Sequence, residues 1–340
     1  MANAGISGTQ AQKVAILGGG AWGTALAATA AHAGHEVLVW DRDPTVADDL
    51  NKRRQNSKRF PHIVLPQNIS GTSNLAKWAS FAETLVVALP SEANAMLASQ
   101  LAAHTRPSQT LVLAAKGFRE TDGALLSTVW REAIPHITQQ VVLTGPTFAK
   151  ELIEQSPTAF VLASPSEGVR EAVAALFTTP WVRPYQGADM VGAQVGGAIK
   201  NVLAVGAGVL EGLGLGHNAR AAMLTRGLHE MARFARAMGG EERTIFGLAG
   251  MGDVMLTATS HLSRNYRFGQ LVGRGTPIAE ARLRMGTVEG LLAARIATVQ
   301  AQSLGLDVAL ISAIDGILHG DVTPLQAVEY LMARPTQMEY

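Results

Sequence analysis

The sequence predicts an α/β N-terminal domain with a doubly wound, mostly parallel sheet, followed by an all-α C-terminal domain. In the first half, short apolar runs without polar alternation are separated by helix-like segments, which is typical of parallel strands buried on both faces. From about Met190 onward these runs disappear, and helical patterns with glycine-rich joints replace them. The strand-like runs are residues 13–17, 36–41, 84–89, 110–115 and 141–145.

Length and composition narrow the class of protein. Because 340 residues exceed what one hydrophobic core usually supports, we expect two domains, at 11–189 and 190–334, with tails at 1–10 and 335–340. A net charge of +1, from 28 basic and 27 acidic residues, argues against a general nucleic-acid-binding surface. The chain has no cysteine, which fits a cytoplasmic location, and residues 1–12 do not resemble a signal peptide.

Two stretches of the second half are predicted to be helices of a soluble domain. Residues 191–210 are apolar enough to be tested as a membrane span, but five glycines and the central Lys200 argue for a buried helix and against membrane insertion. Residues 218–240 place apolar side chains at helical spacing, with Asn218 as the expected N-terminal cap and Gly239 as the expected end.

A glycine-rich turn follows the first predicted strand and opens the first predicted helix. Gly18, Gly20 and Gly23 form the pattern G-x-G-x-x-G, and in this context the backbone N–H groups at the helix start can receive a pyrophosphate. The competing interpretation is a turn without a ligand, and the strand, the helix and the βαβ spacing that follows argue against it. We therefore expect the first domain to bind a dinucleotide.

The end of the second predicted strand bears on the choice of coenzyme. Asp41 could accept hydrogen bonds from a ribose 2′-hydroxyl, whereas Arg42 could pair with a 2′-phosphate. The two residues argue in opposite directions, so NADP and NAD both stay open, with NADPH favoured.

Lys200 is the one ionisable side chain in the apolar stretch VGGAIKNVLAVGAGVL. A lysine is rarely buried without a partner, because its charge is costly to remove from water. Glycine and alanine occupy the same helical face at spacings of three, four, seven and eight residues. That face could pack against another helix or admit a flat nicotinamide and a substrate, and the lysine favours the ligand.

A charge partner for this lysine is available in residues 247–269. Asp253 follows a glycine-rich turn, and Thr257 lies one helical turn later. Ser263, Arg264 and Asn265 then form a polar cluster suited to phosphate. Taken singly, Asp253 could be an ordinary helix cap and Arg264 a solvated surface charge.

At these residues the chain resembles the bacterial NAD(P)-dependent glycerol-3-phosphate dehydrogenases. The resemblance runs from about Lys13 to about Leu331 and rests above all on GGAIKN and on GLAGMGD followed by SRN. The other motifs in the family's order are GGGAWGTALA, VALPS, AAKGF, LTGPTFAKE, GLGLGHNARAAMLTRG and TVEG. The resemblance implies a Rossmann domain followed by a helical domain, often as a homodimer. It also implies reversible reduction of dihydroxyacetone phosphate to sn-glycerol 3-phosphate, a precursor of phospholipids.

The resemblance also implies roles for single residues. Lys200 would be the proton donor and acceptor and Asp253 its charge partner, supported by Asn201 and Thr257. The implied substrate-binding residues are Lys116, Gly145, Thr147, Lys200, Asp253, Ser263, Arg264 and Asn265. The expected coenzyme-binding residues combine those of the glycine turn and of the end of the second strand with those that the resemblance implies. They are Gly18, Gly20, Ala21, Trp22, Gly23, Asp41, Arg42, Lys116, Ala149, Arg264, Val288 and Glu289. Ala21 and Asp41 depart from the family's pattern, and Asp41 argues against a strict preference for NADP.

Reduction of a carbonyl explains why a lysine would stand in an apolar helix. Hydride arriving at the carbonyl carbon leaves an alkoxide, and a positioned ammonium can stabilise that charge and give up a proton. Burial lowers the pKa of a lysine and a nearby carboxylate raises it, so Lys200 needs both the apolar helix and Asp253.

Other functions would share part of this sequence pattern. A 3-hydroxy-acid or sugar-nucleotide dehydrogenase would share the dinucleotide motif and the lysine helix, and a regulator without catalysis would share the motif alone. A metal-dependent hydrolase needs ligand-spaced histidines, whereas the nine histidines here are scattered, so no metal is expected. The basic run KRRQNSKR, residues 52–59, could suggest nucleic-acid binding, but a solvated loop near the mouth of the site is expected instead.

Overall fold

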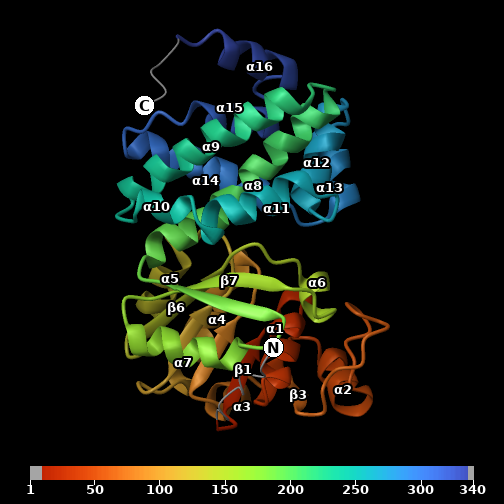
Figure 1. The fold of residues 1–340 in the computed structure, drawn as a ribbon, viewed down its shortest axis with the longest axis vertical. Helices are drawn as coiled ribbons and strands as arrows, with labels where there is room; N and C mark the ends of the chain where they lie inside the picture. Colours follow the sequence, from red (N-terminus) through yellow and green to blue (C-terminus); the bar gives the residue numbers. More distant parts are fainter. Residues whose placement is uncertain (1–9, 336–340) are drawn as a thin grey trace, which may run out of the picture. The chain divides into compact units, whose positions relative to one another are not determined.

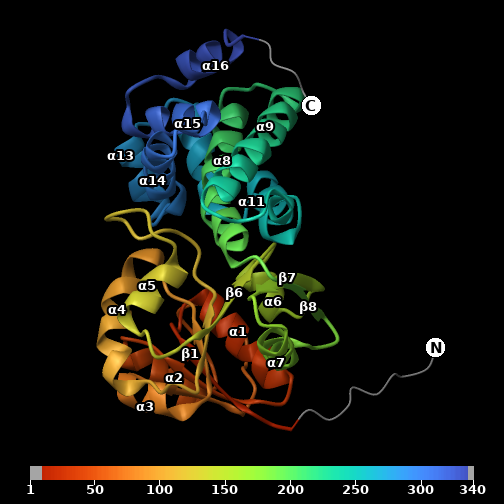
Figure 2. The ribbon, with the colours of Figure 1, turned by 90° about the vertical axis from the view of Figure 1, so that its left-hand side faces the viewer.

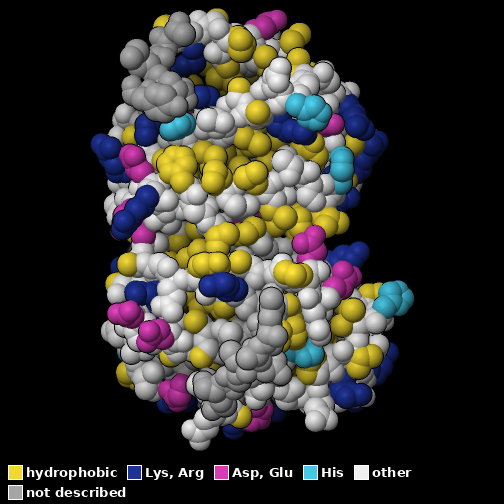
Figure 3. Space-filling view, viewed as in Figure 1, with side chains coloured by type: hydrophobic (Ala, Val, Ile, Leu, Met, Phe, Trp, Pro, Cys, Tyr) yellow, Lys and Arg dark blue, Asp and Glu magenta, His cyan; other side chains and the backbone are white. Residues whose placement is uncertain are grey.

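The computed structural model describes residues 10–335, which form two compact units (Figure 1). One unit contains the described residues up to Ala115 together with Leu126–Met190. The other contains Lys116–Leu125 together with the described residues from Val191 onward. On the face seen in Figure 3, basic and acidic side chains are scattered over both units, as the small net charge leads one to expect.

The first unit is an eight-stranded sheet with helices on both faces. Its strands are β1 Lys13–Leu17, β2 Glu36–Trp40, β3 Ile69–Thr72, β4 Thr84–Val87, β5 Thr110–Leu113, β6 Gln139–Thr144, β7 Thr158–Ala163 and β8 Val182–Gly187. Their order is β3-β2-β1-β4-β5-β6-β7-β8, and all neighbours pair in parallel except β6 and β7. The helices are α1 Ala21–His32, α2 Pro44–Arg53, α3 Leu75–Phe81, α4 Asn94–Leu101, α5 Leu126–Ala133, α6 Ala149–Ile153 and α7 Glu167–Phe177, with short 3₁₀ turns at Ser91–Ala93 and Ala102–His104.

Alternate residues of the central strands face two different helical layers. Val14 and Ile16 of β1 belong to the core beneath α1, whereas Ala15 and Leu17 belong to the core that contains Trp78 of α3. Figure 2 shows α1, α6 and α7 on one side of the sheet and α3, α4 and α5 on the other. Because both faces are covered, these strands contain no polar alternation, and the predicted doubly wound sheet is confirmed.

Three strands, β3, β7 and β8, are not among the runs that the sequence predicted. β3, with the sequence ISGT, has a single large apolar residue, Ile69, and β8 carries Pro184 and the exposed Gln186. Neither segment forms an unbroken apolar run, because β3 and β8 lie at the two edges of the sheet. The antiparallel pairing of β6 with β7 likewise has no signature in the local sequence.

The second unit is helical throughout its described residues. It contains α8 Met190–Gly212, which begins at the junction of the units, followed by α9 His217–Ala237, α10 Glu242–Ile245, a π-helical turn at Leu248–Gly252, α11 Asp253–Thr259, α12 Arg264–Gly273, α13 Ile278–Met285, α14 Glu289–Ser303, α15 Ala309–His319 and α16 Pro324–Met332. One apolar core joins these helices, and α8 runs through it (Figure 1). The apolar window of α8 that is long enough to cross a membrane is 100% buried in this core, as expected for an interior helix.

The small residues of α8 are explained by close contact with other helices. A Cβ atom on Gly208 would lie 2.1 Å from a backbone oxygen of α12, and a Cβ atom on Gly269 of α12 would lie 2.1 Å from a backbone oxygen of α8. Gly212 and Gly273 repeat this approach one turn later. The expectation that a ligand accounts for the small face around Lys200 is therefore wrong at Gly208, where the close packing of α8 against α12 requires a glycine.

Two local predictions also differ from the structure. Asn218 is not the N-terminal cap of its helix, because α9 already begins at His217 with Gly216 in the cap position. Gly239, with φ +89°, does follow the end of that helix, as predicted. The basic run at 52–59 is only partly a loop, since Lys52 and Arg53 complete α2.

Candidate active site

The glycine turn between β1 and α1 has the shape that a pyrophosphate requires. Gly18 has φ +116°, and a Cβ atom there would lie 2.6 Å from the backbone oxygen of Ala88. A Cβ atom on Gly23 would lie 1.9 Å from the oxygen of Gly18, whereas a Cβ atom on Gly20 would meet nothing within 4 Å. The turn is tight where it packs and open at Gly20, where the unpaired N–H groups of the first turn of α1 begin. These residues fit a dinucleotide.

The two residues after Gly20, Ala21 and Trp22, differ in what their side chains contact at the start of α1. Trp22 donates a hydrogen bond from Nε1 to the backbone oxygen of Ala114, 3.1 Å away, at the end of β5. Ala21 is half-buried and has no side chain able to donate to a phosphate. Any anion held at this position must therefore depend on backbone donors.

Three further expected site residues follow β6: Gly145, Thr147 and Ala149. They lie at the carboxyl ends of the parallel strands, as the glycine turn after β1 does. Gly145 has φ +141°, and a Cβ atom there would lie 3.0 Å from the Cα atom of Phe160. The hydroxyl of Thr147 donates to the oxygen of Gly145 over 3.1 Å, and Ala149 is the first residue of α6. Ligands of open α/β sheets bind outside the carboxyl ends of the strands, so these residues are well placed for binding.

Asp41 and Arg42 follow the last residue of β2, so they also lie at the carboxyl ends of the parallel strands. The Oδ1 atom of Asp41 accepts a hydrogen bond from the N–H of Asp43, 2.9 Å away. Its Oδ2 atom lies 2.8 Å from the point that a Cβ atom on Gly19 would occupy, so the carboxylate lies against the glycine turn. Arg42 is exposed and makes no ion pair with any residue between 10 and 335.

Asn56 is a residue of this region that the sequence did not reveal. It is 1% exposed and donates from Nδ2 to the oxygen of Gly19 and to the hydroxyl of Thr24, both over 2.8 Å. Its neighbours in the sequence are basic or polar, so its burial has no local signal. The basic run is thus attached to the glycine turn.

In the helical unit, Lys200 meets the partner that the sequence predicted. Its Nζ atom lies 2.7 Å from Oδ1 of Asp253 and 2.9 Å from the hydroxyl of Thr257. Thr257 in turn donates to the same carboxylate oxygen over 3.2 Å. Asp253 is fully buried and Lys200 is 8% exposed, so the ion pair is shielded from water.

The second oxygen of Asp253 binds a second lysine. The Nζ atom of Lys116 lies 2.5 Å from Oδ2, so one carboxylate holds two ammonium groups. Burial lowers the pKa of Lys116 to about 8, although the charge of Asp253 opposes that shift. Burial alone would raise the pKa of Asp253, but the two lysine charges outweigh it and lower that pKa. The carboxylate therefore stays ionised, and the group of three carries a net positive charge.

A π-helical turn explains how this aspartate reaches the lysine. The glycine-rich segment Leu248–Gly252 is a wide helical turn that runs directly into α11, and not the simple turn that was expected. A Cβ atom on Gly196 of α8 would lie 2.4 Å from the oxygen of Ala249 in this turn. Gly196 and Ala249 each precede the paired residues Lys200 and Asp253 by four positions, so their close approach brings lysine and carboxylate together. Such turns are frequent at functional sites.

Two asparagines link α8 to the neighbouring helices. Asn201 donates to Oε2 of Glu289 over 2.8 Å and accepts from Nδ2 of Asn265 over 2.9 Å. Asn265 also accepts from the N–H of Gly290 over 3.0 Å. Val288 precedes this point as the cap residue of α14 and is buried in the core. The amide groups of both asparagines are thus engaged by protein, which limits what Asn265 can offer to a substrate.

The start of α12 offers donors for an anion. Ser263 is the N-terminal cap, and its hydroxyl oxygen accepts from the N–H of Tyr266 over 3.2 Å. Arg264 is the first helical residue and is exposed, and no ion pair to it occurs among residues 10–335. An arginine beside the unpaired N–H groups of a helix start is a favourable place for phosphate.

The expected site residues fall into two groups. Gly18, Gly20, Ala21, Trp22, Gly23, Asp41, Arg42, Gly145, Thr147 and Ala149 lie in the sheet unit. Lys116, Lys200, Asn201, Asp253, Thr257, Ser263, Arg264, Asn265, Val288 and Glu289 lie in the helical unit. Within the helical unit, direct hydrogen bonds join Lys116, Lys200, Asp253 and Thr257, and separately Asn201, Asn265 and Glu289.

Comparisons with known proteins show which family this chain is similar to. Sequence models of the NAD-dependent glycerol-3-phosphate dehydrogenase N-terminus and C-terminus match residues 13–169 and 189–329. The chain is 40% identical over 333 residues to a glycerol-3-phosphate dehydrogenase [NAD(P)+] of Stenotrophomonas maltophilia, covering 98% of each chain. It is 40% identical over 327 residues to the enzyme of that name from Rhodospirillum rubrum, covering 96% of this chain and 93% of the relative. The crystal structure of glycerol-3-phosphate dehydrogenase from Coxiella burnetii superposes with a TM-score of 0.89 at 32% identity, covering 95% of this chain and 99% of the other.

Proposed function

The chain belongs to the NAD-dependent glycerol-3-phosphate dehydrogenase family, and from this premise we propose how its own residues reduce dihydroxyacetone phosphate to sn-glycerol 3-phosphate. It is an NAD(P)-dependent oxidoreductase, and the related 3-hydroxy-acid and sugar-nucleotide dehydrogenases are not favoured. The observation that carries the proposed mechanism is the buried carboxylate of Asp253, which holds Lys200 on one oxygen and Lys116 on the other.

Lys200 is assigned as the proton donor and acceptor. A nicotinamide coenzyme, when bound, supplies a hydride to the carbonyl carbon of the substrate. The carbonyl oxygen then becomes an alkoxide, to which the ammonium of Lys200 can transfer a proton. The carboxylate of Asp253 pairs with that ammonium, and the hydroxyl of Thr257 accepts a second hydrogen bond from it, so the two contacts hold Nζ in place. Oxidation of glycerol 3-phosphate uses the same groups in reverse.

Asn201 and Glu289 are assigned as positioning residues. Asn201 is the residue after Lys200, and its amide ties α8 to α12 through Asn265 and to α14 through Glu289. Because Asn201 and Asn265 are buried and Glu289 is partly buried, these contacts restrain the helix on which the lysine stands. Val288 and Glu289 are proposed to reach the coenzyme from the start of α14.

Lys116 is assigned to the binding of the substrate and the coenzyme. Since its pKa is lowered to about 8, its charge is present below that pH and is lost as the pH rises through it. We expect kcat/KM for the reduction to fall on the alkaline side near pH 8. In Lys116→Arg the guanidinium stays charged, so this alkaline limb should move to higher pH even if the maximal rate is lower. Rates measured from about pH 6 to about pH 10 test this, and an unmoved limb in the variant would assign it to another group.

Arg264 is assigned to the phosphate of the substrate, together with Ser263 and the start of α12. A guanidinium bonded to phosphate contributes roughly 1.5 to 3 kcal/mol. Arg264→Met should therefore lower kcat/KM for dihydroxyacetone phosphate at least about tenfold, with a far smaller effect on unphosphorylated dihydroxyacetone. Arg267→Met, which removes another exposed arginine of the same helix, is the control. Equal losses for both substrates, with coenzyme affinity intact, would place Arg264 at the reacting carbonyl or in the fold.

The reaction itself is tested with purified protein and dihydroxyacetone phosphate, with NADH and NADPH compared side by side. We expect turnover with both coenzymes and a preference for NADPH. Formation of sn-glycerol 3-phosphate, measured directly, separates this reaction from slow coenzyme oxidation. Absence of turnover with either coenzyme would leave only the binding of a nucleotide and would favour a regulator.

The proposed function also includes the domain bounds, the cellular compartment, the oligomeric state and the use of the product. We propose that the dinucleotide-binding domain is residues 11–189 and the catalytic domain residues 190–334, that the enzyme works in the cytoplasm as a homodimer, and that its product supplies phospholipid synthesis. The absence of cysteine fits a reducing compartment. Analytical ultracentrifugation over a range of protein concentrations tests the dimer.

A further inference from the structure

The basic run after α2 is held against the glycine turn by a buried contact. Asn56 donates to the oxygen of Gly19 and to the hydroxyl of Thr24, which stand in the glycine turn and in the first turns of α1. The chain then reverses within five residues, because the N–H of Phe60 donates to the oxygen of Asn56 over 2.7 Å. The segment Asn56–Phe60 is therefore fixed to the part of the unit that fits a pyrophosphate.

Two further contacts place this segment beside the end of β2. The N–H of Ser57 donates to Oδ2 of the buried Asp49 over 2.7 Å. Lys58 forms an ion pair with Asp43, the N-terminal cap of α2, and the hydrogen bond that it donates there is the largest cause that lowers the pKa of Asp43 to about 2. Since Asp43 is two residues from Asp41, the segment lies next to the residues that precede α2, where the adenosine ribose of a dinucleotide is bound in such sheets.

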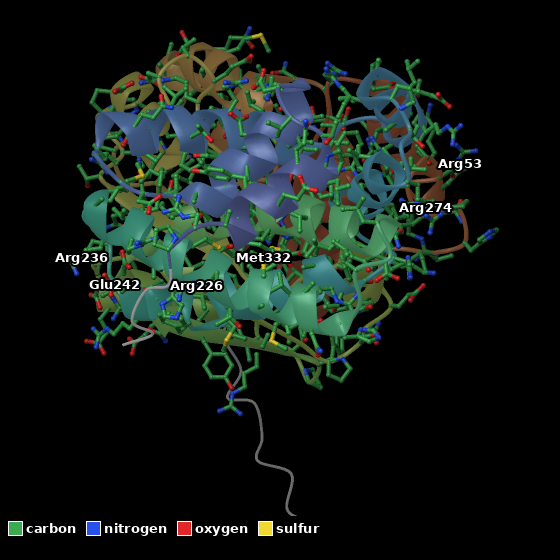
Figure 4. The ribbon with its side chains drawn as sticks, turned by 90° about the horizontal axis from the view of Figure 1, so that it is seen from above. Arg53, Arg226, Arg236, Glu242, Arg274 and Met332 are labelled. Atoms are coloured by element: carbon green, nitrogen blue, oxygen red, sulfur yellow. The ribbon has the colours of Figure 1, made fainter. Side chains whose placement is uncertain are left out.

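The charges of this region do not cancel. Each acidic residue of α2 and its cap holds one cation, in the pairs Lys58–Asp43, Lys52–Asp48 and Arg53–Asp49. Arg53 projects outward from its unit (Figure 4). Three arginines are left exposed and without an ion pair in the part of the chain that the structure describes: Arg42, Arg54 and Arg59. Two of them, Arg42 and Arg59, directly adjoin the residues of the Lys58–Asp43 pair.

We propose that Arg59 is a second ligand, beside Arg42, for the 2′-phosphate of NADPH, and that Asn56 is the positioning residue that holds Arg59 at the coenzyme site. This inference rests on the proposed function and concerns the same site. The carboxylate of Asp41 lies against the glycine turn and would repel a 2′-phosphate. The attraction between the phosphate and Arg42 alone would therefore be largely offset by this repulsion. A second guanidinium makes the local charge positive and allows the phosphate to be held from two sides.

The sharpest probe is a pair of nucleotides that differ only in the 2′-phosphate: adenosine 2′,5′-bisphosphate and adenosine 5′-monophosphate. Their dissociation constants are measured by calorimetry on the full chain, without substrate. The parent should bind the bisphosphate more tightly. Arg59→Ala should weaken the bisphosphate at least about tenfold, which is about 1.4 kcal/mol, and change the monophosphate by less than about twofold.

Lys52→Ala is the matched control, because it removes one positive charge from the same run at an exposed ion pair on α2. It should change the affinity for either nucleotide by less than about twofold. If Lys52→Ala weakened the bisphosphate as much as Arg59→Ala did, a general electrostatic field and not a ligand would explain the effect. Equal affinity of the parent for both nucleotides, or an unchanged ratio in Arg59→Ala, would overturn the assignment of Arg59.

Asn56→Ala tests the positioning role through the ratio of the two affinities. A residue that only stabilises the fold would lower the melting temperature and weaken both nucleotides alike, leaving the ratio unchanged. We expect the ratio to fall toward that of Arg59→Ala. If neither nucleotide binds to the parent, the dinucleotide site of the proposed function itself is wrong. If both bind and the ratio does not respond, only the present inference fails.

Discussion

Replacing Lys200 by methionine is expected to reduce kcat for the reduction of dihydroxyacetone phosphate by roughly 10² to 10⁴. Methionine nearly matches the length of the lysine side chain and suits the buried helix, so the loss should reflect the missing proton donor and not a disturbed core. The residues that fit the pyrophosphate lie in the other unit, so binding of coenzyme should persist. Steady-state rates and fluorescence titration with NADPH measure the two effects separately.

The control for this variant is Lys77→Met, which removes an exposed lysine of α3 in the sheet unit. It should leave both the rate and the coenzyme affinity unchanged. If Lys200→Met kept turnover within about tenfold of the parent, the general-acid role would have to be abandoned. Loss of coenzyme binding in that variant would instead indicate a disturbed fold, which circular dichroism detects.

Replacing Asp253 by asparagine should affect both activity and stability. Two ammonium groups share this carboxylate, and the NH₂ of an amide would face one of them as donor against donor. Removing one partner of a buried ion pair typically costs about 3 to 5 kcal/mol of unfolding free energy. We expect a loss of that order in urea denaturation, together with a fall in kcat of at least about 10².

The matched control is Asp48→Asn, which removes the carboxylate of an exposed ion pair with Lys52. Such pairs contribute at most about 1 kcal/mol, so this variant should be nearly as stable as the parent. Rates are compared at a temperature at which circular dichroism shows each variant to be folded. An Asp253→Asn protein with parental stability and parental kcat would contradict the assignment of the buried carboxylate.

The sequence predicted those segments of the fold that are buried along most of their length, because the residues in them are then mostly apolar or small. β1, with the sequence KVAIL, is covered on both faces and is therefore apolar throughout, and α8 is apolar because it runs through a core. β3 and β8 are edge strands with mixed composition, so only their partners define them. The antiparallel pairing of β7 with β6 depends on how the segment between the two strands connects them, and the residues of β7 themselves do not indicate it.

The candidate site shows the same distinction between local and distant causes. A lone lysine in an apolar helix requires a partner, and the sequence could predict Asp253 as that partner. It could not show that Lys116 would share the same carboxylate, because 137 residues separate the two. The burial of Asn56 within a basic run was hidden for the same reason, since its partners Gly19 and Thr24 lie more than thirty residues earlier.

The packing of glycine against glycine between α8 and α12 has a consequence for how the enzyme can lose activity. α8 contains glycines that lower its intrinsic tendency to be helical, so its conformation depends on the neighbouring helices. Gly208 cannot be exchanged for the better helix former alanine, because the added methyl group would meet a backbone oxygen of α12 at 2.1 Å. The general acid therefore exists as a catalytic group only while its helical unit is assembled. Inactivation by heat or denaturant should then coincide with cooperative loss of structure, with no earlier stage in which a folded protein has lost only its active site.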